Sequence, residues 1–149
     1  MKHYIIDGNN LIGKIKTLFL LQKKDGQASR EKLVLFLESF FHDKKAKISL
    51  CFDGFPQLAI RTSKIKIYYS ENKPADDIIK NLIENSKNPK VLVVVSSDHN
   101  LMQFARVCHC EVKSSEEFSK EIAERKLSDE EDEKKKSISN DEVKKLFGI

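Results

Sequence analysis

Short segments typical of β-strands alternate with segments typical of amphipathic helices along most of this chain. The clearest strand is residues 91–95, an unbroken and mostly β-branched run of the kind found in a central strand covered on both faces. The clearest helix is residues 29–43, where Leu and Phe side chains recur at helical spacing. Strands that alternate with helices form parallel sheets. The sequence therefore predicts an α/β fold with a mostly parallel central sheet of about five strands flanked by helices.

Shorter patterns predict the remaining elements. Residues 64–69 alternate between a polar and an apolar face, which indicates a strand at the edge of the sheet. Residues 12–25 remain ambiguous. A chain of 149 residues has the usual size of one domain, which we place at residues 1–126, with a charged linker and a short C-terminal helix at residues 127–149. The other predicted strands are residues 2–6, 48–52 and 108–112, and the other predicted helices follow Pro74 and span residues 101–107 and 116–126.

Charge is distributed unevenly along the chain. Residues 1–113 carry 19 Lys and Arg against 12 Asp and Glu, whereas residues 114–149 carry 8 against 11. A basic body suits a polyanionic partner such as a nucleic acid, although a solvated lysine-rich surface explains the same balance. Charge alone does not decide between the two.

Two features bear on the compartment. The longest apolar run has five residues, far fewer than the roughly 18 needed to span a membrane, and the N-terminus lacks a signal-peptide layout. We expect a cytoplasmic protein with no membrane partner. Cys108-His109-Cys110 does not predict a zinc site, because a strand would turn the histidine away from the cysteines and no second cysteine pair closes a tetrahedral site. Three cysteines are an odd number, which favours reduced thiols.

Three of the predicted strands end on an aspartate: Asp7, Asp53 and Asp98. Ligands of an open parallel sheet bind outside the carboxyl ends of its strands. A single aspartate after a strand is often only a turn residue, but three at one edge indicate a site.

A fourth carboxylate comes from the helix after Pro74. Helical spacing places Asp76 on the apolar face with Ile79 and Ile83, and Asp77 on the solvated face with Lys80. The favourable position of an acid in a first helical turn explains Asp77 well. It explains Asp76 poorly, because an inward carboxylate needs a partner to offset its desolvation.

The side chains of Asp7, Asp76 and Asp98, gathered together, would repel one another unless a cation neutralised them. A cluster of carboxylate oxygens without His or Cys matches Mg²⁺ or Mn²⁺. Such an ion activates a water for hydrolysis and stabilises charge on a phosphate. We expect Asn9 or Asn10 to hold that water or the phosphate, and Ser97 to serve in the same way beside Asp98.

Four motifs, in order, resemble those of NYN domains, specifically the YacP-like branch of the PIN-like nucleases. The resemblance extends over residues 2–118 and implies a three-layer, Rossmann-like fold with strand order near 3-2-1-4-5, and metal-dependent cleavage of RNA. By position it implies that Asp7, Asp76 and Asp98 bind the metal, with Asn10 as the motif asparagine and Asp53 nearby. The motifs are Tyr4-Ile5-Ile6-Asp7-Gly8-Asn9-Asn10, Cys51-Phe52-Asp53-Gly54, Ala75-Asp76-Asp77-Ile78-Ile79 and Val94-Val95-Ser96-Ser97-Asp98.

The chain also departs from the family pattern. Asn9 stands where the family often has an aromatic residue, and a further acid found in many PIN-like enzymes is not located. We therefore predict one metal ion and leave a second open. Basic side chains outside the cluster are candidates for contacts with an RNA backbone, with Tyr68 or Phe55 stacking on a base. These candidates are Lys14, Lys16, Arg61, Lys64, Lys66 and Arg106.

The leading hypothesis is an Mg²⁺- or Mn²⁺-dependent endoribonuclease that acts on messenger or structural RNA, with a ribosome as one particle that could present the substrate. A DNA or flap nuclease on the same fold, and a non-catalytic RNA-binding or adaptor module, remain alternatives. A phosphatase or phospho-receiver with Asp7 as nucleophile is disfavoured, because no second acid follows two residues later. The oligomeric state is left open.

Overall fold

The chain folds around one parallel sheet of five strands. The computed structural model describes residues 1–133 and 145–148. The strand order is β3-β2-β1-β4-β5, and every neighbouring pair is parallel. The predicted fold class is therefore confirmed, together with the strand order and the edge position of β3. The strands are β1 (Lys2–Asp7), β2 (Ala46–Phe52), β3 (Ile65–Tyr69), β4 (Leu92–Val95) and β5 (Glu111–Lys113).

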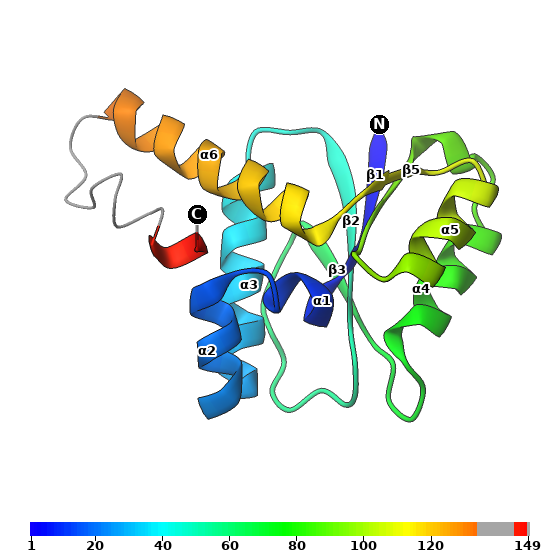
Figure 1. Cartoon of the computed structure of the whole chain (residues 1–149), viewed down its shortest axis with the longest axis horizontal. Helices are drawn as coiled ribbons and strands as arrows, with labels where there is room; N and C mark the ends of the chain where they lie inside the picture. Colours follow the sequence, from blue (N-terminus) through cyan, green and yellow to red (C-terminus); the bar gives the residue numbers. More distant parts are fainter. Residues whose placement is uncertain (134–144, 149) are drawn as a thin grey trace.

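Helices cover both faces of this sheet and give a three-layer arrangement (Figure 1). One face carries α1 (Gly8–Ile12), α2 (Lys16–Lys24), α3 (Gly26–Phe41) and α6 (Ser115–Glu133). The other face carries α4 (Ala75–Glu84) and α5 (His99–Val107). A 3₁₀ turn, Pro89–Val91, leads into β4. No helix in the described ranges is long and apolar enough to cross a membrane.

The alternation of side chains along each strand divides the core in two. Ile6, Leu50 and Val95 pack toward α1, α2, α3 and α6, whereas Ile5 and Val94 pack toward α4 and α5. All four residues of β4 are buried, as the unbroken apolar run predicts. Burial of each aliphatic side chain stabilises the fold by about 1.5–3 kcal/mol. Because both faces of the sheet are packed in this way, the ends of its strands are held in fixed positions.

The strand predicted at residues 108–112 is placed wrongly. Helix α5 ends in a turn in which His109 has a positive φ of 69° and the Cys110 N–H donates to the Ala105 carbonyl at 2.9 Å. This turn consumes residues 108–110, so β5 begins only at Glu111. The facing argument used against zinc therefore does not apply to Cys108-His109-Cys110, and all three cysteines are free thiols.

The structure also defines the segment that was ambiguous in the sequence and parts of the C-terminal segment. Residues 16–24 form α2, and the helix predicted at residues 116–126 begins at Ser115 and continues to Glu133. The C-terminal turn docks on the body: Phe147 is buried with its ring 5.0 Å from that of Phe36, and the Thr17 hydroxyl donates to the Leu146 carbonyl at 2.6 Å. Residues 134–144 and 149 lie outside the described residues, so the division at residue 126 stays a prediction.

Candidate active site

Asp7 is the last residue of β1 and the most deeply buried acid of the candidate site. Its side chain is on the same face of the sheet as Ile5, toward α4 and α5, and the residue is only 6% exposed. The next strand, β4, brings Ser96 beside it, and the Ser96 hydroxyl donates to Asp7 Oδ2 at 2.9 Å. Ser96 is fully buried, so this bond fixes one oxygen of the carboxylate inside the protein.

The step from Asp7 into α1 depends on the absence of a side chain at Gly8. A Cβ atom there would lie 2.7 Å from the Phe52 ring and 2.9 Å from the Cys51 carbonyl oxygen. The end of β2 therefore approaches the backbone of Gly8 closely, and this contact sets where β1 ends and Asp7 begins the turn.

Asp76 approaches the site from the first turn of α4. It is half-buried, whereas Asp77 is exposed, which is the orientation that the helical spacing predicts. Asp53, at the end of β2, holds this helix in place, because its Oδ1 accepts from the Ala75 N–H at 2.8 Å. The exposed Asp53 thus has a structural task at the N-terminus of α4.

Asp98 reaches the same edge from the loop after β4. Its Oδ1 accepts from the Leu101 N–H at 2.9 Å and so caps α5. Its own N–H donates to the Ser96 hydroxyl at 3.1 Å. One buried hydroxyl therefore links the Asp7 carboxylate to the backbone of Asp98.

The surroundings of Asp7 and Asp76 disfavour the negatively charged form of their carboxyl groups. Burial raises the pKa of Asp7 to about 6, the Ser96 hydrogen bond opposes the rise, and the carboxylates of Asp76 and Asp53 add to it. Burial also raises the pKa of Asp76, and Asp98 is the next cause. The charges of Asp76 and Asp53 therefore act unfavourably on Asp7, and the charges of Asp98 and Asp53 act unfavourably on Asp76.

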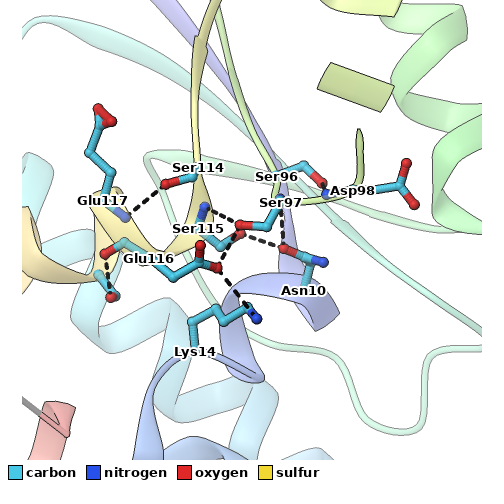
Figure 2. A network of polar contacts seen from close by, with 10 residues as sticks. Asn10, Lys14, Ser96, Ser97, Asp98, Ser114, Ser115, Glu116 and Glu117 are labelled. Carbon is cyan, nitrogen blue, oxygen red and sulfur yellow. Dashed lines mark hydrogen bonds and ion pairs between the residues drawn. The ribbon is translucent and has the colours of Figure 1, made fainter. Parts of the chain in front are cut away.

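A second group of polar side chains gathers around Ser97, just after the end of β4 (Figure 2). Asn10 Oδ1 accepts from the Ser97 N–H at 2.9 Å and from the Ser115 hydroxyl at 2.6 Å. The Ser97 hydroxyl accepts from the Ser115 N–H at 2.9 Å and donates to Glu116 Oε1 at 2.7 Å. Lys14 Nζ lies 3.4 Å from the same Glu116 oxygen. These bonds tie α1 and α6 to the end of β4.

This second group differs electrostatically from the acids. The Ser97 hydroxyl and then the Lys14 ammonium lower the pKa of Glu116. Figure 2 shows the Asp98 carboxylate turned away from Asn10 and Glu116. Of the residues predicted to assist the site, Asn10 and Ser97 therefore have their oxygens engaged in a structural network beside the acids. Asn9 is engaged too, since its Oδ1 accepts from the Asp53 N–H at 2.9 Å.

The predicted RNA-binding lysines and arginines do not form one surface at the site. Lys64, at the start of β3, donates to the carbonyls of Phe41 and Lys44, and so completes the C-terminal end of α3. Arg106 occupies the last turn of α5. This turn and the start of β3 lie at the end of the sheet where the parallel strands begin, opposite the end that carries the acids. Lys66 lies over the Tyr68 ring, with Nζ 5.2 Å from its centroid.

Two of the remaining basic residues lie on or beside the N-terminal helices. Lys14 pairs with Glu116, and Lys16 begins α2. Arg61 instead lines a cavity of about 220 Å³ between α3 and the loop after β2, with Glu31 and Glu38 on its rim. Phe55, predicted to stack on a base, is exposed in that loop, and its carbonyl accepts from Arg30 at 2.9 Å.

Hard oxygen donors make this group chemically suited to Mg²⁺ or Mn²⁺. A cation would also offset the repulsion that raises the pKa values of Asp7 and Asp76. In residues 1–133 and 145–148, however, the His, Cys, Asp and Glu side chains form no group of three or more positioned to hold a metal ion. The donor chemistry fits, but the acids as they stand are neighbours rather than a closed set of ligands.

Sequence reasoning missed Ser96 and Glu116 as members of these groups. A signal for Ser96 was present in the sequence. Val94 is the register partner of Ile5, and Ser96 and Asp7 each come two residues later on neighbouring parallel strands, so their side chains point to the same face. Glu116 carried no such signal, because it contacts Ser97 and Lys14 only through tertiary structure.

Comparisons with known proteins agree with this fold. A family model described as the YacP-like NYN domain matches residues 4–147. A crystal structure of a mutant of Rae1 (YacP) from Bacillus subtilis is similar with a TM-score of 0.74 and 22% identity, covering 99% of this chain and 92% of that one. A second crystal structure of Rae1 (YacP) is similar with a TM-score of 0.72 and 21% identity, covering 91% and 81%. No curated protein sequence matches the chain.

Proposed function

The chain belongs to the YacP-like NYN domain family, and from this premise we propose that it is a metal-dependent endoribonuclease. Its substrate is messenger or structural RNA, free or presented on a ribosome, and the reaction is hydrolysis of a phosphodiester bond. One observation carries the proposal most directly. The Asp7 carboxylate, 6% exposed at the carboxyl ends of a parallel sheet, has a pKa raised to about 6, mainly by burial and further by the charges of Asp76 and Asp53.

Each residue of the acid group has a defined task in this proposal. Asp7 and Asp76, whose charges act on each other, would each supply a carboxylate to the metal, and Asp98, at the N-terminus of α5, would supply a third. Ser96 orients Asp7 through its hydroxyl and holds the Asp98 backbone with the same oxygen. Asp53 keeps α4, and therefore Asp76, at the required position by accepting from Ala75.

The proposed cofactor is one Mg²⁺ or Mn²⁺ ion, with a second left open. When bound, such an ion lowers the pKa of a water and stabilises negative charge on the phosphate. The residues of the chain supply the anionic oxygens that hold the ion. They also exclude water from Asp7, so that its charge is neutralised by the ion rather than by solvent.

The proposal is tested by cleavage of a labelled RNA with Mn²⁺, with Mg²⁺ and with EDTA, beside a DNA strand of matched sequence. Asp76→Asn and Asp77→Asn form a matched pair, because the two acids are adjacent on α4 but only Asp76 is half-buried. We expect cleavage of RNA that requires the metal, is lost in Asp76→Asn and is kept in Asp77→Asn. Equal loss in both variants, or cleavage in EDTA, would contradict the proposal. Preferential cleavage of the DNA strand would assign a DNA or flap nuclease instead.

One observation favours a second candidate, a non-catalytic RNA-binding or adaptor module. The described acids form no ready group of three metal ligands. The two candidates differ in how metal affects stability. A nuclease should show a rise in Tm with millimolar Mn²⁺ that an Asp7→Asn/Asp98→Asn double variant lacks, because only the wild type gains binding energy in the folded state. Melting that ignores the metal would favour the adaptor.

A further inference from the structure

Helix α2 carries an exposed basic and aromatic surface that the acid group does not use. Residues 8–24 contain four lysines and no Asp or Glu. Three of these lysines, Lys16, Lys23 and Lys24, are exposed on α2. Ion pairs between the described residues include none of the three. The surface is therefore positive, with Asp25 at the end of α2 as the neighbouring acid in the sequence.

Two large apolar side chains lie among these lysines. Phe19 is 41% exposed and Leu20 is 50% exposed. The Lys23 ammonium lies 4.4 Å from the centroid of the Phe19 ring, so a positive charge is held against an aromatic face. Below them, Leu18 is fully buried, which anchors α2 to the core and fixes the direction of the exposed face.

This surface follows directly after α1 in the chain, and contacts of α1 and α3 reach the end of β2 at Asp53. Asn9 accepts from the N–H of Asp53, and Arg30 Nη2 donates to the Asp53 carbonyl at 2.6 Å. Arg30 lies in the first turns of α3, directly after the Asp25 corner where α2 ends. Figure 1 places α1 and α2 together at the end of the sheet where the strands finish. An RNA that spans both regions would therefore pass over α1, which lies between β1 and α2 in the chain.

We propose that the surface formed by Lys16, Phe19, Lys23 and Lys24 binds single-stranded RNA, with a base stacked on Phe19 and the backbone phosphates paired with the lysines. Exposed lysines beside an exposed aromatic ring suit a single-stranded nucleic acid, because every base has a face for stacking and every nucleotide carries a phosphate. This inference rests on the proposed function, since it names the binding surface for the same substrate.

The test measures binding of a labelled 12-nucleotide RNA by fluorescence anisotropy in EDTA, so that cleavage does not interfere. Lys23→Gln/Lys24→Gln should weaken binding and reduce the slope of log K against log salt by about 1.4, at about 0.7 for each lost phosphate contact with a single strand. The matched control is Lys87→Gln/Lys90→Gln, which removes the same charge from two exposed positions. Both lie between α4 and the start of β4, at the end of the sheet opposite the acids. The control should change neither quantity.

A second pair of variants tests the aromatic ring. Phe19→Leu keeps the apolar packing of this partly buried side chain and removes the stacking face, and should weaken binding about five-fold or more. The control Leu20→Ala shortens an equally exposed apolar neighbour and should have little effect. Far-ultraviolet circular dichroism and melting of each variant confirm that the fold is retained.

Other occupants of the surface give different results. If the α2 variants lose binding to vesicles that contain phosphatidylserine but bind RNA as the wild type does, the proposal is overturned in favour of a membrane. A wild-type dimer that Leu20→Ala converts to a monomer, again with RNA binding unchanged, would overturn it in favour of a second copy of the chain. Failure of the proposed function gives a different result. If RNA binds through α2 but is not cleaved in Mn²⁺, the nuclease proposal fails and the binding surface stands. If RNA is cleaved while all α2 variants bind it normally, the binding surface is overturned and the nuclease proposal stands.

Discussion

The adjacent serines Ser96 and Ser97 belong to two regions with opposite electrostatic character. Ser96 faces the group of Asp7, Asp76 and Asp98, where burial and like charges raise the pKa values of Asp7 and Asp76. Ser97 faces Asn10, Ser115 and Glu116, where hydrogen bonds and Lys14 lower the pKa of Glu116. The two serines are adjacent in the chain, and Figure 2 shows the Ser97 network with the Asp98 carboxylate turned away from it.

The difference between the regions teaches which polar residues at a sheet edge are available to a ligand. The Ser97 side has donors matched to acceptors and therefore holds elements together. The Ser96 side gathers carboxylates with few donors, an arrangement that costs stability unless something positive binds there. Polar residues of both kinds end the same strand, so position alone does not separate a structural residue from a functional one.

Among the variants that compare the two regions, the largest effect is expected from the two serines themselves. Ser96→Ala should lower metal-dependent RNA cleavage by about 10- to 100-fold, the range found when a group that orients a metal ligand is lost. Ser97→Ala should leave cleavage within a few-fold of the wild type. Cleavage rates at saturating Mn²⁺ and during a Mn²⁺ titration give the measurement. Recovery of activity in Ser96→Thr, which restores the hydroxyl, would separate orientation from a loss of packing. Equal effects of both alanine variants would mean that the comparison is wrong.

A steric change at Gly8 should damage the Asp7 side through the fold. In Gly8→Ala the added Cβ meets the Phe52 ring at 2.7 Å and a backbone oxygen at 2.9 Å, so the end of β1 has to move. We expect the free energy of unfolding to fall by about 1–3 kcal/mol, as for other overpacked cores. Urea unfolding measures the change, and Gly26→Ala serves as control because a Cβ there meets nothing within 4 Å. A neutral Gly8→Ala would show that the close contact with β2 is not required.

The unfavourable charge of Asp7 predicts a dependence of stability on pH in the absence of metal. Its pKa is about 6 in the folded protein and 3.8 as the ordinary value. The raised value means that protonated Asp7 stabilises the fold below pH 4 and that this contribution is lost as pH rises through 6. At pH 7 the loss is at most about 3 kcal/mol, from about 1.36 kcal/mol for each unit of pKa.

Asp7→Asn removes this titration. In EDTA we expect the variant to be more stable than the wild type at pH 7 and equal to it near pH 4. Thermal unfolding across this range is the measurement, with Asp77→Asn as an exposed control whose difference from the wild type stays flat. A wild type that is as stable as Asp7→Asn at pH 7 would show that the carboxylate is not penalised.

The smallest effect is expected on the Ser97 side. Glu116→Gln removes an exposed ion pair with Lys14, in which the Glu116 side chain is 54% exposed, and exposed pairs are worth about 0–1 kcal/mol. The free energy of unfolding should change by no more than that, and RNA cleavage should stay near the wild-type rate. A large loss of cleavage would place Glu116 among the functional acids and remove the distinction between the two regions.

Much of the fold was predictable because it follows from periodicity. The unbroken run in β4 and the alternation in β3 indicated a central and an edge strand, and helical spacing placed Asp76 inward and Asp77 outward. The turn at His109 was not predictable from β-forming residue types, because the helix cap at Cys110 and Ala105 overrides that local preference.

The limits of prediction at the site have a similar cause. Asp7, Asp53 and Asp98 could be placed at one edge from the strand ends alone. That Asn9 and Asn10 have their amide oxygens occupied, or that Lys64 donates to the carbonyls of Phe41 and Lys44, depends on partners at least 20 residues away in the sequence. Residue type and spacing carry no record of such partners, whereas they do carry the period of a strand or helix.

The central position of β1 has a consequence for how the protein is made. Synthesis produces β1 first, but Ile5 and Ile6 have neighbours on both sides only once β4 exists. At roughly 5–20 residues per second, the ribosome needs on the order of 5–20 s to add the roughly 90 intervening residues. During that interval one edge of an apolar strand is unpaired, and Asp7 lacks the hydroxyl that orients it. The carboxylate group therefore exists only in chains that have been translated past Asp98, so nascent chains shorter than this do not contain the complete site.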